Sequence, residues 1–169
     1  MPLDKSALLN FLKEVDKELE VPITLVAVGG TALTLLDAKA STMDVDFTIP
    51  SNDYAIFKET LGRISHGFKV DCWEDGAVFS QILPNDYLVR SISVKKTKHI
   101  CLRALNPVDI VVTKIGRLDT RDIQDIETAI RKFKLRKSQI VKRAKHVEYV
   151  GRDENYETNL NYVLGNLFK

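Results

Sequence analysis

The sequence of 169 residues is poor in the features that mark several specialised classes of protein. Its only cysteines, Cys72 and Cys101, lack metal-ligand spacing and sit in strand-like segments, so we expect buried, reduced thiols. No apolar run approaches the ~20 residues that a membrane-spanning helix needs. The segment MPLDKSALLNFLKEVDKELE carries acids where a secretory signal has a basic end and an apolar centre. These absences predict a cytoplasmic protein that does not enter a membrane.

A strong charge of one sign is also absent, because the net charge is only +2. No global field would therefore attract nucleic acid. The distribution is uneven, since residues 131–145, RKFKLRKSQIVKRAK, hold eight basic residues and no acid. This basic run is typical of a solvated helix face or a cationic helix end, and it also suits a surface for phosphate backbones. Few aromatic residues are interleaved with it, which argues against base stacking there.

Hydrophobic periodicity predicts one helix, then mixed strands and helices, then a helical tail. The segment ITLVAV is apolar throughout except for one threonine, which is typical of a strand buried on both faces. MDVDFTI alternates, so Asp44, Asp46 and Thr48 are predicted to share one strand face. The predicted helices of this part are 4–19, 31–37 and 50–61, and the predicted strands are 23–28, 43–49 and 68–73, with short strands between 77 and 104.

Capping residues predict the helices of the tail. Three helices are predicted to begin at the caps Asn106, Thr120 and Ser138. Pro107 suits the first helical position, and that helix is predicted to run to about Arg117. Gly151 is predicted to end the third of these helices. A last helix is predicted near 154–167.

Two adjacent glycines, Gly29 and Gly30, separate the apolar strand from the short helix that follows it. Glycine lets the backbone approach a bulky anion, and the first N–H groups of a helix suit phosphate. Thr31 adds a hydroxyl group. The alternative is simple packing, and the pattern is neither a P-loop nor G-x-G-x-x-G. The glycines alone therefore leave a phosphate site and a structural turn open.

The carboxylates of Asp44 and Asp46 form the second unusual pattern. Two like charges on one strand face do not favour folding, and carboxylate oxygens are the ligands that Mg²⁺ prefers. The alternative is an exposed pair of acids. If the two strands are neighbours, the glycines would hold phosphates while the aspartates hold the bridging metal ions, as phosphoryl transfer requires.

Together these motifs resemble the nucleotidyltransferase superfamily of the polymerase-beta type. The resemblance rests on GGTAL followed by DVDF, with thirteen residues between Gly30 and Asp44. The later segment LNPVDIVVTKIGRLDTRDIQDI is similar to the abortive-infection toxin branch of that superfamily. The resemblance covers residues 23 to about 130. It implies an α/β (α+β) fold with a small mixed sheet flanked by helices, divided into a core of residues 1–105 and a helical region of residues 106–169.

The resemblance also implies roles for particular residues and cofactors. Gly29, Gly30 and Thr31 would contact the nucleotide phosphates, although the family has serine where this chain has Gly30. Two Mg²⁺ ions, or Mn²⁺, would be expected, and Lys114 would face the triphosphate or the acceptor. The implied metal ligands are Asp44, Asp46 and Asp71, and the acids of the Arg-Asp-x-x-Asp element are Asp122 and Asp125. Asp122 or Asp125 would fix Lys114 or activate the attacking hydroxyl, whereas the structural alternative is a salt-bridged pair of helices.

Three functions follow, of which the first is favoured. It is transfer of a nucleoside monophosphate from a nucleoside triphosphate to a hydroxyl of RNA, protein or a small molecule. The basic run would then be an acceptor surface, and an antitoxin would be a possible partner by analogy with the toxin branch. The second function is nucleotide or RNA binding without turnover, and the third is a plain interaction domain. Trp73 suits core packing, although an aromatic side chain near a cleft can also stack on a base.

Overall fold

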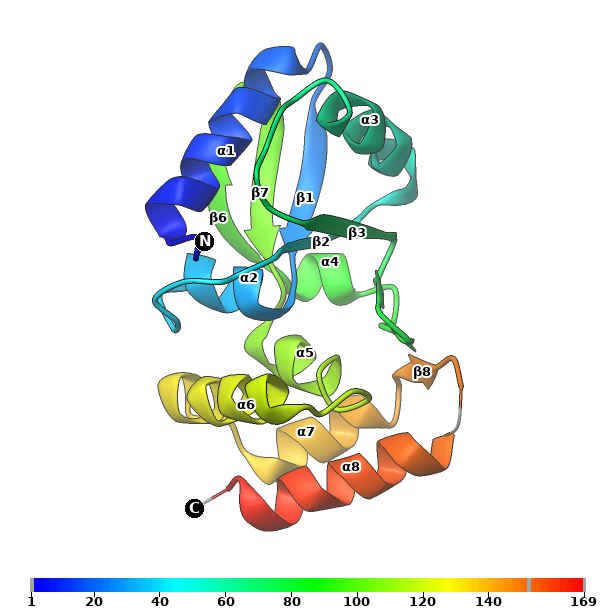
Figure 1. The fold of residues 1–169 in the computed structure, drawn as a ribbon. Coiled ribbons are helices and arrows are strands. Elements are labelled where there is room, and N and C mark those ends of the chain that lie inside the picture. Colours follow the sequence, from blue (N-terminus) through cyan, green and yellow to red (C-terminus); the bar gives the residue numbers. More distant parts are fainter. Residues whose placement is uncertain (1, 152, 169) are drawn as a thin grey trace.

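The computed structural model describes residues 2–151 and 153–168 and is built around a five-stranded mixed sheet (Figure 1). The strand order is β3-β2-β1-β7-β6. β1 is parallel to β7 and antiparallel to β2, β2 is parallel to β3, and β6 is antiparallel to β7. The strands are β1 (Ile23–Ala27), β2 (Val45–Ile49), β3 (Val70–Glu74), β6 (Ile92–Lys96) and β7 (Ile100–Ala104).

β1 is the central strand, as its near-continuous apolar sequence predicts. Leu25, Val26 and Ala27 are fully buried, because β1 has a neighbouring strand on each side and packed layers on both faces. In β2 the apolar residues Val45, Phe47 and Ile49 are also fully buried. The predicted mixed sheet flanked by helices, with a helical tail, is therefore confirmed.

Four helices belong to the part of the chain that carries the sheet. They are α1 (Lys5–Glu18), α2 (Gly29–Leu35), α3 (Ser51–Leu61) and the short α4 (Tyr87–Arg90). Asp4 caps α1 by accepting a hydrogen bond from the backbone N–H of Ala7 at 2.8 Å. Phe57 of α3 packs edge-on against Phe47 of β2, with ring centroids 5.7 Å apart. These contacts close the core over the sheet.

The tail contains α5 (Pro107–Val112), α6 (Thr120–Phe133), α7 (Lys137–Ala144) and α8 (Asp153–Asn166), stacked beyond one end of the sheet in Figure 1. Asn106 caps α5 as predicted, but α5 ends at Val112, and turns replace the predicted continuation. Asp119, not Thr120, caps α6. Ser138 lies inside α7, whose N-cap is Arg136, and Gly151 follows a strand instead of ending that helix.

A second, three-stranded sheet links the tail to the rest of the chain. It consists of β4 (Ala77–Val78), β5 (Gln81–Ile82) and β8 (Glu148–Tyr149), in the order β4-β5-β8. Arg143 of α7 adds an ionic link, because its Nη2 lies 2.9 Å from Oδ1 of Asp86, the residue before α4. The division into residues 1–105 and 106–169 remains a prediction, and elements of both parts contact one another closely.

Two expectations about composition can be compared with the structure. Cys72 and Cys101 are free thiols, as predicted, but both are only partly buried, because each belongs to a strand with a partly accessible face. No helix in the described part of the chain combines the length and the apolarity needed to cross a membrane.

Candidate active site

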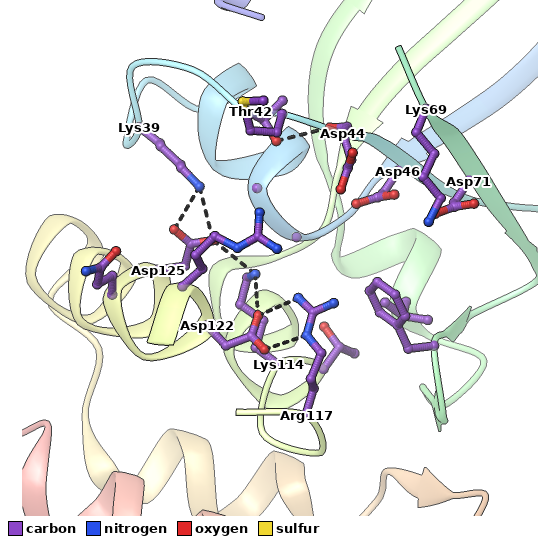
Figure 2. Close-up of a pocket in the computed structure, with 18 of the residues that line it drawn as sticks. Lys39, Thr42, Asp44, Asp46, Lys69, Asp71, Lys114, Arg117, Asp122 and Asp125 are labelled. Carbon is purple, nitrogen blue, oxygen red and sulfur yellow. Dashed lines mark hydrogen bonds and ion pairs between the residues drawn. The ribbon is translucent and has the colours of Figure 1, made fainter. Parts of the chain in front are cut away.

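A cleft of about 380 Å³ lies where the main sheet meets α5 and α6 (Figure 2). Its walls come from segments that are distant in sequence: the start of α2, the N-terminal ends of β2 and β3, the β4–β5 turn, and the residues around α6. The predicted site residues that line this cleft are Gly29, Gly30, Asp44, Asp46, Asp71, Lys114, Asp122 and Asp125. The fold therefore gathers both of the sequence motifs in one place.

Strand pairing brings the third acid to the first two. Asp46 of β2 and Asp71 of β3 are register partners in the parallel pair, and Asp44 lies just before β2. Figure 2 shows all three carboxylates on the sheet side of the cleft. We call them the carboxylate wall. Thr48, two residues after Asp46 on the same strand face, does not line the cleft, because it is fully buried and accepts a hydrogen bond from the Gly76 N–H at 2.8 Å.

Asp46 is the carboxylate with the most unusual surroundings. Burial, together with the neighbouring charges of Asp71 and Asp44, raises its pKa to about 6, although Lys114 and Arg117 act in the opposite direction. Its Oδ1 atom is buried and has no hydrogen-bond partner within the described part of the chain. A buried carboxylate oxygen without a donor is costly, so this atom is suited to a ligand that supplies positive charge.

The two glycines shape the floor of the cleft. Gly29 has φ +54°, and a Cβ atom there would lie 3.8 Å from Nζ of Lys114 and 4.0 Å from Oδ2 of Asp46. A Cβ atom at Gly30 would lie 2.9 Å from Oγ1 of Thr42, which is closer than real contacts allow. A side chain at position 30 would therefore push against the neighbouring threonine, which favours glycine there.

Thr31 differs from the prediction that it contacts phosphate. Its side chain is fully buried, and its hydroxyl donates to the backbone oxygen of Asp44 and accepts from the N–H of Asp46, both at 3.0 Å. The two hydrogen bonds occupy the hydroxyl group. Thr31 therefore positions the two aspartates by holding the backbone of α2 against the start of β2.

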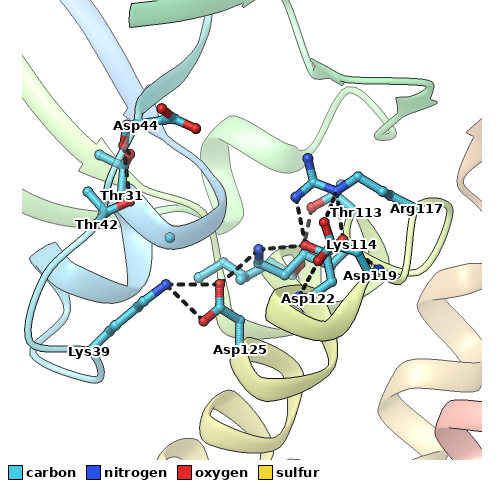
Figure 3. A network of polar contacts seen from close by, with 12 residues as sticks. Thr31, Lys39, Thr42, Asp44, Thr113, Lys114, Arg117, Asp119, Asp122 and Asp125 are labelled. Carbon is cyan, nitrogen blue, oxygen red and sulfur yellow. Dashed lines mark hydrogen bonds and ion pairs between the residues drawn. The ribbon is translucent and has the colours of Figure 1, made fainter. Parts of the chain in front are cut away.

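The opposite side of the cleft carries an ion-pair network, which Figure 3 shows from close by. Asp122 is fully buried, and its oxygens accept from Nζ of Lys114 at 3.1 Å and from Nε of Arg117 at 2.7 Å. Asp125 joins Lys114 to Lys39, since its oxygens lie 3.0 Å from each Nζ atom. We call these five side chains the paired wall.

Local sequence explains why Asp122 is held so firmly. It is the third residue of α6 and forms a capping box with Asp119, in which each side chain accepts from the other's backbone N–H. Burial acts to raise the pKa of Asp122, but the hydrogen bonds and charges of Arg117 and Lys114 outweigh it, so the pKa is lowered. Asp122 is thus a permanent anion that fixes two cations.

The donor types of the carboxylate wall fit a divalent cation. Asp44, Asp46 and Asp71 offer oxygen ligands, and the partnerless Oδ1 of Asp46 is the observation that favours a cation there. Among the described residues, no three or more His, Cys, Asp or Glu side chains form a ready-made metal group. Asp71 instead pairs with Nζ of Lys69 at 3.2 Å.

Two parts of the site were missed or misjudged from sequence. Lys39 belongs to the loop after α2, and the sequence gives no signal that it reaches across to α6. Phe79 lines the cleft from the β4–β5 turn, and its sequence context does not mark it as a site residue.

In the basic run, Arg143 is buried by its ion pair with Asp109, so it does not belong to an exposed surface. The other seven basic residues of 131–145 are exposed.

Comparison with known proteins gives one family and two similar structures. The sequence matches the family described as "Nucleotidyltransferase of unknown function (DUF6036)" over residues 6–160. A crystal structure of ANT(2″)-Ia in complex with adenylyl-2″-tobramycin has a TM-score of 0.56 at 14% identity, covering 84% of this chain and 95% of that chain. A solution structure of the antibiotic-resistance factor ANT(2″)-Ia has a TM-score of 0.50 at 12% identity, covering 95% and 91%. No curated protein matches the sequence.

Proposed function

Because the chain belongs to the nucleotidyltransferase family that it matches over residues 6–160, we propose that it transfers a nucleoside monophosphate from a nucleoside triphosphate to an acceptor hydroxyl. The family assigns the protein to the enzymes, in preference to a binding module or an interaction domain. We further propose that the transfer depends on a metal ion, and we propose roles for single residues and classes of acceptor. The narrower likeness to the abortive-infection toxin branch is likewise part of the proposal.

One observation supports the proposal more than any other. Asp46 has a buried oxygen without a hydrogen-bond donor, faces Asp71 across paired strands, and lies in the same cleft as Lys114. A folding requirement does not explain such an arrangement. A neutral residue at position 46 would avoid both the cost of burying a charge and the repulsion from the neighbouring carboxylates. A divalent cation held by these carboxylates would compensate for both.

In the proposed complex Asp44, Asp46 and Asp71 would hold two Mg²⁺ ions, with Mn²⁺ as an alternative. Divalent cations supply neutralisation of phosphate charge and polarisation of the α-phosphate when they are bound. The backbone of Gly29 and Gly30 approaches the phosphates, since neither residue has a side chain to obstruct them.

The reaction is a displacement at the α-phosphorus. The acceptor oxygen forms a bond to this atom while the bond to the oxygen that bridges to the β-phosphorus breaks, so that pyrophosphate leaves. Asp71 accepts the proton of the acceptor hydroxyl, because its side chain, 31% exposed, is accessible from the cleft. No covalent intermediate with the protein is required.

The paired wall positions positive charge opposite the carboxylates. Lys114 lies near Gly29 and neutralises the triphosphate, while Asp122 and Asp125 fix its ammonium group. Of the two roles considered for Asp122, fixing Lys114 is supported by its complete burial. Asp122 lines the cleft, but both of its oxygens accept hydrogen bonds from Lys114 and Arg117, so Asp122 is a positioning residue.

The acceptor is an RNA, a protein or a small molecule. The exposed basic residues of α6 and α7 support an RNA or an acidic protein surface, and an antitoxin partner would follow from the toxin-branch likeness. The fold likeness to ANT(2″)-Ia, whose crystal structure contains adenylyl-2″-tobramycin, supports a small-molecule acceptor. One experiment separates these classes.

We would incubate the protein with Mg²⁺ and each α-³²P-labelled nucleoside triphosphate, together with cellular RNA, proteins or a small-molecule extract. Label should move to one class of acceptor and be lost in Asp46→Asn. The matched control is Glu59→Gln, since Glu59 is an exposed acid of α3. Equal transfer by Asp46→Asn and the control would refute the metal-site assignment.

A further inference from the structure

Phe79 is an aromatic residue in an unusual backbone conformation. It lies in the turn between β4 and β5, has φ +53°, and is 44% exposed. A left-handed φ is rare and strained for a bulky residue, and such strain tends to persist at functional positions. Phe79 also lines the cleft. An apolar side chain that is both strained and exposed is not explained by core packing.

Phe79 forms a larger surface together with two neighbouring side chains, those of Trp73 and Arg117. Its ring centroid lies 4.6 Å from that of Trp73, at an interplanar angle of 49°. The guanidinium carbon of Arg117 lies 4.7 Å from the Phe79 centroid. Arg117 cannot rotate freely, because Asp122 accepts from its Nε at 2.7 Å and from an Nη atom at 2.8 Å.

The surface lies beside the carboxylate wall and is open to the cleft. Trp73 and Asp71 are two residues apart on β3, so they share a strand face and are separated by about 7 Å along the strand. The side chain of Arg117 is 45% exposed and lines the cleft with Phe79. A ligand whose phosphates are held in the cleft would reach Phe79 with the group attached to them, because Phe79 lines the same cleft.

We propose that Phe79 and Arg117 form a platform on which the base of the nucleoside triphosphate stacks. The inference rests on the proposed function and adds the residues that bind the base. Aromatic rings and guanidinium planes both stack on nucleobases, and stacking tolerates any base because every base has a π-face. The platform therefore predicts binding of all four triphosphates, with purines preferred for their larger area.

The single tryptophan provides a direct readout, since Trp73 contacts Phe79. We would titrate the protein, with Mg²⁺, using a non-hydrolysable α,β-methylene nucleoside triphosphate and, separately, inorganic tripolyphosphate. Both should bind, but only the nucleotide should change the Trp73 fluorescence. Tripolyphosphate serves as the control because it presents the same phosphates without a base.

Two variants of Phe79 separate loss of the ring from loss of the fold. Phe79→Gly suits the left-handed turn and removes the ring, whereas Phe79→Tyr keeps the ring. Phe79→Gly should weaken nucleotide binding by about 5- to 100-fold, the usual effect of losing one stacking partner, and leave tripolyphosphate binding unchanged. Phe79→Tyr should bind both ligands like the unchanged protein.

The possible outcomes separate the platform from the proposed function. If Phe79→Gly binds the nucleotide as well as the unchanged protein does, the platform is wrong and the proposed function stands. The platform is also wrong if Phe79→Gly weakens binding of a single-stranded RNA oligonucleotide but not of the nucleotide, because the ring then serves the acceptor. If neither the nucleotide nor tripolyphosphate binds, both proposals are refuted.

Discussion

The two walls of the cleft hold their charges in opposite ways. In the paired wall, the carboxylates of Asp122 and Asp125 each lie within 3.1 Å of a cation. In the carboxylate wall, three acids lie together, and Oδ1 of Asp46 has no partner in the described residues. The pKa of Asp122 is lowered while that of Asp46 is raised to about 6. The same residue type therefore contributes stability on one wall and lowers it on the other.

This difference indicates which wall is suited to bind a ligand. A buried ion pair whose hydrogen bonds are complete is rigid and gains little from a further partner. Clustered acids with a raised pKa are typical of sites that bind a cation or take part in proton transfer. Under the proposed function, the paired wall would act as a fixed frame and the carboxylate wall would bind the metal ions.

The largest expected effect is the loss of transfer when the carboxylate wall is altered. Asp46→Asn should reduce nucleotidyl transfer by at least about 10²–10³-fold, because it removes a charge that would hold the cations. Initial rates at saturating Mg²⁺ and triphosphate would measure this. Glu59→Gln should keep the full rate. A rate of Asp46→Asn within a few-fold of the control would mean that this carboxylate binds no essential cation.

Altering the paired wall should affect stability first. Asp122→Asn should lower the free energy of unfolding by about 2–4 kcal/mol, because Lys114 and Arg117 then lose their shared anion in a buried site. Urea denaturation would measure the change. The control Asp37→Asn removes an exposed pair with Lys5 and should cost at most about 1 kcal/mol. Similar costs for the two variants would contradict the difference between buried and exposed pairs.

The raised pKa of Asp46 predicts a pH dependence of metal binding. Because the carboxylate must be ionised to bind a cation, Mn²⁺ affinity should fall about tenfold for each unit of pH below about 6. Asp71→Asn removes a neighbouring negative charge and should move the midpoint to lower pH, although overall affinity falls. Mn²⁺ titrations from pH 4.5 to 8 would detect both changes. An unchanged midpoint would show that Asp71 does not repel Asp46.

Replacing the glycines should have smaller effects that differ between the two positions. Gly29→Ala places a side chain at φ +54° and should cost about 1–2 kcal/mol of stability. Gly30→Ala would push against Thr42, so the double variant Gly30→Ala/Thr42→Ala should recover part of the loss. The measurement is thermal unfolding of four proteins: the unchanged protein, Gly30→Ala, Thr42→Ala and the double variant. Together they form a double-mutant cycle. Strict additivity of Gly30→Ala and Thr42→Ala would argue against the contact.

The smallest expected effect concerns the basic run. Lys142→Gln/Lys145→Gln removes two exposed cations and should weaken RNA binding about uniformly across sequences, with a reduced salt dependence. Arg143→Gln should mainly lower stability, because Arg143 is buried against Asp109. RNA binding at several salt concentrations would test the first variant. An unchanged salt dependence would remove this surface from the acceptor proposal.

The elements of the core were predicted from local patterns, and the acids of the cleft were predicted mainly from the resemblance to the nucleotidyltransferase superfamily. Burial on both faces of β1 follows from ITLVA, whereas the pairing of Asp46 with Asp71 depends on a strand register that the sequence alone does not set. The contact of Lys39 with Asp125 could not be predicted, because it joins residues 86 positions apart through a loop without a motif. The backbone conformation of Phe79 was equally hidden, since nothing in its neighbours demands a left-handed turn.

The most direct test compares the stability of the unchanged protein and Asp46→Asn at pH 7.5, with EDTA and with Mg²⁺ plus the non-hydrolysable triphosphate. A carboxylate whose pKa is raised in the folded state destabilises that state above the folded pKa, so Asp46→Asn should be more stable in EDTA, by about 1–3 kcal/mol. It should also lose most of the stabilisation that Mg²⁺ and the nucleotide give the unchanged protein. A variant that is less stable in EDTA and gains as much from the ligands would contradict the account of the carboxylate wall.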